Sequence, residues 1–94
     1  MHVIMQPDIK KLKKFKMAVG NIFKDFRKST GKSQRTFADE YDIDRGNISK
    51  LERGLICCNL ITAWKISEAS NIDFVEFARL LKEELGDDFK LMDE

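Results

Sequence analysis

The chain has 94 residues, of which 43% are hydrophobic and 35% are charged, and its formal net charge is +1. A chain of this length can bury one small core, so we expect a single domain with no room for an effector domain. No apolar run approaches the roughly 18 residues of a membrane span, and the first five residues are too short for a secretory signal, so we expect a cytoplasmic protein without membrane contact.

The segment from Asp8 to Lys28 places apolar residues at helical spacing, with Pro7 suited to the first turn. The apolar residues are Ile9, Leu12, Phe15, Val19, Ile22, Phe23 and Phe26. The pattern fits one long helix or two, because Gly20 near the middle lowers helix propensity by about 1 kcal/mol. The same segment carries Lys10, Lys11, Lys13, Lys14 and Lys16. These lysines form either a solvated face or an arm that contacts additional phosphates.

A short helix is predicted directly after Ser33. The Ser33 hydroxyl is a good N-cap, and Phe37, Ala38 and Tyr41 fall on one helical face after it. The helix should end near Asp42, where the chain turns. A small side chain at Ala38 allows a second helix to cross closely.

That second helix is predicted to start at Asp44, another N-cap candidate, and to end at Gly54 as a left-handed C-cap. Ile48 and Leu51 form its inward face. The outward face then carries Arg45, Gly46, Asn47, Ser49 and Lys50. Two short helices crossing tightly are typical of a helix-turn-helix.

Two further helices are predicted after the N-cap candidates Asn59 and Asp73. The apolar residues of the first are Leu60, Ala63, Trp64 and Ile66, and those of the second are Phe74, Phe77, Ala78, Leu80, Leu81 and Leu85. The last helix carries more apolar surface than one small core needs. Either a dimer interface uses Phe74, Phe77, Leu81 and Leu85, or Phe74 and Leu81 close the monomer core over Trp64.

Over roughly Val19 to Leu81 the chain resembles the phage repressor and Cro-like (XRE-type) helix-turn-helix transcriptional regulators. The residues that carry the resemblance are Gly20, Phe23, Phe26, Arg27, Ser33, Gln34, Ile48, Ser49, Glu52, Arg53, Gly54, Leu60, Thr62, Lys65, Ile66 and Ala69. The resemblance implies an all-α fold, a compact bundle of about five helices with a lambda-repressor-like DNA-binding domain. Family members bind two-fold DNA sites as dimers, so we expect a homodimer.

The chain departs from the family pattern at three positions. Asp42 stands where the family usually has Gly, Cys58 where it often has Pro, and Lys32 where an apolar residue is common. If position 42 needs a positive φ, Asp stores about 1 kcal/mol of strain there, an amount that the motif can absorb.

The resemblance also implies roles for individual residues. A recognition helix presents its N-terminal turn to base edges, so the base-reading residues are expected to be Arg45, Gly46, Asn47, Ser49 and Lys50. Arg45, Gly46 and Lys50 fall where family members touch bases, and we expect guanine in each half-site. Phosphate contacts are expected from Lys32, Ser33, Gln34, Arg35 and Arg53. Arg27 and Glu52 are expected to form an internal ion pair between the first and third helices.

The small net charge conceals an asymmetry. Residues 1–53 carry 13 Lys and Arg against 7 Asp and Glu, a net +6, whereas residues 54–94 carry 4 against 9, a net −5. The basic half contains the reading helix, so the field should orient the protein toward a polyanion. We therefore divide the chain into a basic extension or start of a long first helix at 1–18, a DNA-binding domain at 19–85 and an acidic tail at 86–94.

An enzyme or a metal protein is not expected. His2 is the one histidine, and neither Cys57 nor Cys58 has a base at recognisable spacing, so no catalytic residue, cofactor or metal ligand is predicted. The two cysteines are adjacent, which disfavours a mutual disulfide, and we expect reduced thiols with one of them packed.

The predicted function is sequence-specific binding of double-stranded DNA by a transcriptional regulator, with repression by a homodimer on a two-fold operator as the default. The alternative is a protein-interaction module, such as an antitoxin that binds a partner protein with or without autoregulatory DNA binding. The acidic C-terminal residues suit a protein partner, although a solvated, partly frayed tail is their usual explanation.

Overall fold

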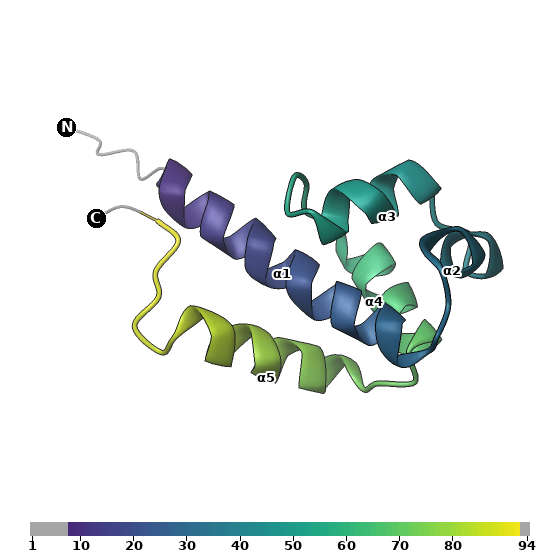
Figure 1. The fold of residues 1–94 in the computed structure, drawn as a ribbon. Coiled ribbons are helices and arrows are strands. Elements are labelled where there is room, and N and C mark those ends of the chain that lie inside the picture. The colour runs from purple at the N-terminus through teal and green to yellow at the C-terminus, as the bar shows by residue number, and fades with distance from the viewer. Residues whose placement is uncertain (1–7, 93–94) are drawn as a thin grey trace.

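The computed structural model describes residues 8–92, which form an all-α bundle (Figure 1). The helices are α1 (Ile9–Ser29), α2 (Gln34–Glu40), α3 (Arg45–Glu52), α4 (Leu60–Ala69) and α5 (Phe74–Leu85). The predicted five-helix fold is confirmed. Pro7 and His2 lie outside the described residues, as does the end of the expected acidic tail.

Local chemistry sets where the helices begin. The side chains of Ser33, Asp44, Asn59 and Asp73 accept hydrogen bonds from amides in the first turns that follow them, and Asp8 does the same for α1. An N-cap satisfies amides that have no partner inside the helix. The four N-caps predicted from the sequence are therefore confirmed, and each fixes the start of a helix.

Five of the described residues, all between or after helices, have a positive φ: Gly31, Asp42, Gly54, Asn71 and Gly86. Gly54 follows α3 with φ +74°, as predicted for its C-cap. Asp42, between α2 and α3, has φ +53°. The position therefore does need a positive φ, which Asp adopts less readily than Gly. Asn71, between α4 and α5, has φ +56°, and the sequence reasoning did not anticipate this one.

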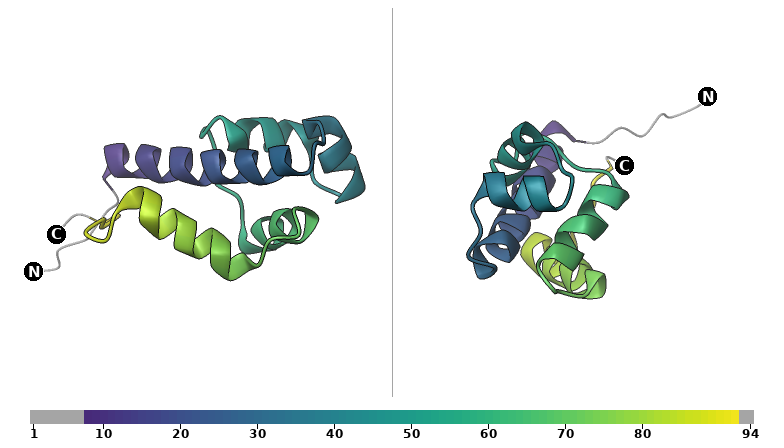
Figure 2. Two further views of the ribbon diagram at one scale, coloured as in Figure 1. Left: turned by 60° about the horizontal axis from the view of Figure 1, so that its bottom comes forward. Right: turned by 90° about the vertical axis from the view of Figure 1, so that its right-hand side faces the viewer.

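Helix α1 is one continuous helix. The segment around Gly20 therefore forms one long helix and not two. It lies between α3 on one side and α5 on the other (Figure 2). Gly20 is buried, and a methyl group there would collide with the carbonyl oxygen of Leu51 and lie 3.2 Å from that of Glu52. The glycine is needed because the backbones of α1 and α3 approach closely, and packing outweighs its low helix propensity.

The core contains side chains from all five helices, with α1 at its centre. Phe23 stacks on Phe77 with ring centroids 4.5 Å apart. Phe77 is 8% exposed, which corrects its assignment to a dimer interface, because its ring is already packed inside the monomer. Phe74 stacks on the exposed Trp64 at 5.4 Å, while Leu81 is half-buried against the core.

The segment after α5 folds back along the first turns of α1 (Figure 1). The backbone amide of Asp8 donates to the carbonyl of Leu91 at 3.2 Å, and Phe89 stacks on Phe15 with ring centroids 6.4 Å apart. The Nζ atom of Lys14 lies 3.4 Å from the carbonyl oxygen of Leu85. The N-terminal turns of α1 are thus packed against the C-terminal segment, and the part of the expected tail at 86–92 is ordered against the domain.

Candidate nucleic-acid interface

Helix α3 has one buried and one solvent-facing side. Ile48 and Leu51 are each 2% exposed and pack into the core. The opposite side presents Arg45, Gly46, Asn47 and Lys50 to solvent, while Ser49 is half-buried at its edge. The structure therefore brings the expected base-reading residues onto one accessible face.

The turn between α2 and α3 fixes the direction of α3. The amide of Ile43 donates to the carbonyl of Ala38 at 2.9 Å, and Asp44 Oδ1 accepts from the amide of Asn47 at 2.9 Å. Lys65 on α4 donates through Nζ to the carbonyl of Asp42 at 3.1 Å. This contact of Lys65 could not be predicted from the sequence, since its partner lies on a turn 23 residues earlier in the chain.

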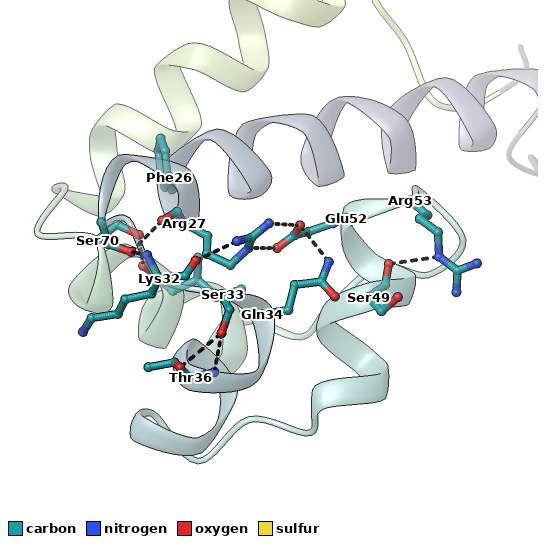
Figure 3. A network of polar contacts seen from close by, with 12 residues as sticks. Phe26, Arg27, Lys32, Ser33, Gln34, Thr36, Ser49, Glu52, Arg53 and Ser70 are labelled. Atoms are coloured by element: carbon teal, nitrogen blue, oxygen red, sulfur yellow. Dashed lines mark hydrogen bonds and ion pairs between the residues drawn. The ribbon is translucent and has the colours of Figure 1, made fainter.

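A buried carboxylate fastens the other end of α3 (Figure 3). Glu52 is 7% exposed, and its two oxygens accept from Arg27 Nε at 2.6 Å and Arg27 Nη2 at 2.9 Å. These hydrogen bonds are the main reason why the pKa of Arg27 is raised, and the attraction of the Glu52 charge acts in the same direction. The ion pair that the resemblance implied is thus a bidentate link between α1 and α3.

The same network reaches α2. Gln34 Nε2 donates to Glu52 Oε1 at 3.0 Å, and Arg27 Nη1 donates to the carbonyl of Lys32 at 2.7 Å. One donor of the Gln34 amide is therefore used inside the protein, although the expectation for this residue was a phosphate contact. The sequence reasoning missed this link, because helical periodicity says nothing about contacts between helices.

The other expected phosphate contacts differ in their surroundings. Lys32 pairs with Glu40, a hydrogen bond that raises the pKa of Lys32, and its ammonium lies 5.2 Å from the centre of the Tyr41 ring. Ser33 is occupied as an N-cap. Arg35 is exposed on α2, and Arg53 is exposed after α3 with Nε 3.3 Å from the carbonyl oxygen of Ser49. Among the residues expected to contact phosphates, Arg35 and Arg53 therefore have the charges most accessible to a ligand.

The cysteines lie beside α3, in the loop before α4. Both are free thiols, Cys57 exposed and Cys58 half-buried against the core. Burial raises the pKa of Cys58 to about 11, so its thiol stays protonated near neutral pH. Within residues 8–92, no group of three or more His, Cys, Asp and Glu side chains is placed to hold a metal ion.

No helix in the described range is both long and apolar enough to cross a membrane. Comparison with protein families gives a model described as helix-turn-helix that matches residues 23–77, more than half of the chain. No individually curated protein matches at a significant level. The matched range contains α2 and α3 and the network around Glu52, so sequence family and geometry agree. The chain belongs to the helix-turn-helix family and is a DNA-binding transcriptional regulator of the XRE type.

Proposed function

We propose that the protein is a sequence-specific repressor that binds a two-fold operator as a homodimer. The observation that carries the proposal is the solvent-facing side of α3, where Arg45, Asn47 and Lys50 are exposed. A helix held in this way fits the major groove and presents its first turns to base edges. The proposed mode of repression is steric, in which the bound protein occupies the promoter and excludes polymerase.

The chemistry of these side chains supports a preference for guanine. Arg and Lys donate to O6 and N7 of guanine, and Asn pairs with adenine through its amide. Gly46 has no side chain, so the base opposite it is read by shape or left unread. Arg35 and Arg53 flank the exposed face and are suited to phosphates, which set the register of the protein on the duplex.

Exposed apolar side chains support the homodimer. Leu60, Ile61 and Trp64 are 76%, 70% and 56% exposed and share one face of α4. Val75, at the start of α5, is 73% exposed and follows Phe74, which stacks on Trp64. A patch of this kind marks a protein contact. The proposed interface therefore centres on α4 and the start of α5 and includes Phe74, whereas Leu81 and Leu85 lie farther along α5.

The same apolar side chains also favour a second candidate, in which the domain binds another protein and DNA contact is secondary. An antitoxin that represses its own promoter would combine the two. DNA binding without self-association would favour this second candidate over the homodimer.

The proposal is tested by selecting bound duplexes from a random pool with the purified chain and with the double variant Arg45→Ala, Lys50→Ala. The expected result is a two-fold site containing guanine that is lost in the variant, because each bidentate base contact contributes about 1–3 kcal/mol of discrimination.

The control is Lys82→Ala, which removes an exposed positive charge from α5 and should keep the selected site. Circular dichroism must show that both variants are folded. An unenriched pool for the parent chain would reject sequence-specific regulation, and an identical site for the α3 variant would reject α3 as the reading helix.

A further inference from the structure

The N-terminal turns of α1 lie upstream of the range shared with the family, which begins at residue 23. Residues 9–24 contain six lysines and no Asp or Glu. Lys10 and Lys13 are exposed and have no ion-pair partner among residues 8–92. By contrast, Arg27, Lys32 and Arg79 each pair with a carboxylate. Lys10 and Lys13 thus carry uncompensated positive charge on a helix.

These two lysines lie on the side of α1 that faces α3. Gly54, at the end of α3, approaches Met17 so closely that a methyl group on it would lie 3.0 Å from the Met17 Cα atom. Lys13 and Lys10 precede Met17 by four and seven residues, which places them on the same helical face, one and two turns earlier. The first turns of α1 project past the end of α3 (Figures 1 and 2), so this face is not covered by α3 there.

The depth of the major groove brings a duplex within reach of that face. Packed helices have axes about 8–10 Å apart, and the major groove is about 8.5 Å deep. When α3 lies in the major groove, the phosphates that border the groove lie on either side of α3, at a depth close to that of α1. A lysine on the part of α1 that α3 does not cover can then reach these phosphates.

The first turns of α1 are also held in place. Phe89 stacks on Phe15, and the amide of Asp8 donates to the carbonyl of Leu91. A helix end fixed in this way presents its charges at a defined position, which lowers the entropic cost of binding.

We propose that Lys10 and Lys13 bind DNA phosphates beyond those reached by α2 and α3, so that the protein contacts a longer stretch of duplex than the helix-turn-helix alone. The inference rests on the proposed DNA-binding function and extends it to a second surface. Its chemistry is sequence-independent, so it adds affinity without changing the preferred bases.

The test measures affinity for the selected operator as a function of salt, for the parent chain and for Lys10→Gln, Lys13→Gln. Gln keeps helix propensity and removes the charge. Two lost phosphate contacts should reduce the slope of log K against log salt by about 1.8, at roughly 0.9 for each phosphate. Operator and unrelated duplexes should weaken by the same factor, and ethylation interference should lose phosphates outside the α3 site.

The control is Lys82→Gln, which removes one exposed charge from α5, the helix on the opposite side of α1 from α3 (Figure 2), and it is compared with Lys10→Gln and Lys13→Gln made singly as well as together. A slope for Lys10→Gln, Lys13→Gln equal to that of the control would overturn the inference while leaving the proposed function intact. Loss of binding to vesicles containing anionic lipid, with DNA affinity unchanged, would overturn it in favour of a membrane surface. Failure of the parent chain to bind any duplex would reject both.

Discussion

Glu52, on α3, binds side chains from two other helices, α1 and α2. It accepts hydrogen bonds from Arg27 and Gln34, and Arg27 also binds the carbonyl of Lys32. A buried ion pair contributes little by itself, because desolvation opposes the attraction, but removal of one partner leaves an unpaired charge. The role of this pair is therefore to fix the arrangement of helices rather than to add stability.

Replacement of Glu52 by Ala should lower the free energy of unfolding by about 3 kcal/mol, because the Arg27 guanidinium is left without its partner. Urea denaturation followed by circular dichroism measures the effect. DNA binding should fall in parallel through loss of folded protein. Glu68→Ala on the exposed side of α4 serves as the control and should change stability by less than about 0.5 kcal/mol. Equal stability of the two variants would contradict the structural role.

At the scale of elements, sequence reasoning predicted where the helices begin but not how they approach one another. Caps such as Asp44 and Asn59 act on their own first turns, so their effect is visible in a short stretch of sequence. The need for Gly20 depends on Leu51, on another helix, and no local pattern reveals it. For the same reason periodicity identified the outward face of α3, whereas the contacts that hold α3 became visible only in the fold.

Gly20→Ala should destabilise the protein by roughly 1–3 kcal/mol, although Ala is the better helix former, because the added methyl group forces α1 away from α3. Thermal denaturation provides the measurement. Asn21→Ala is the matched control, since Asn21 is the exposed neighbour on the same helix and should be neutral or slightly stabilising. A gain in stability for Gly20→Ala would mean that the two helices are not in close contact.

At the scale of the whole molecule, the charged halves of the chain correspond to different parts of the fold. The basic excess lies mainly on α1, which carries eight Lys and Arg against one Asp, and the acidic excess lies on the segments after α3. Composition predicted this division. It did not predict which apolar residues remain outside, because Phe77 and Leu60 look alike in sequence and differ only in what the fold places beside them.

Self-association should depend on the exposed face of α4. We expect sedimentation to show a dimer at high concentration, and Leu60→Ser, Trp64→Ser to shift the equilibrium toward monomer without unfolding the protein, since both side chains are largely exposed. Ile9→Ser, at an apolar position that is 83% exposed on α1, should leave the equilibrium unchanged. A parent chain that stays monomeric at every concentration would assign this face to another protein.

The accessible face of α3 contributes almost nothing to the core. Arg45, Gly46, Asn47 and Lys50 are exposed, whereas the residues that hold the helix, Ile48, Leu51 and Glu52, point inward. Substitutions on the outer face therefore change DNA binding, whereas substitutions on the inner face change the free energy of unfolding. A lineage of such proteins can change its target site by several substitutions in succession, each intermediate remaining fully folded, so that new regulatory connections evolve without passing through unstable forms.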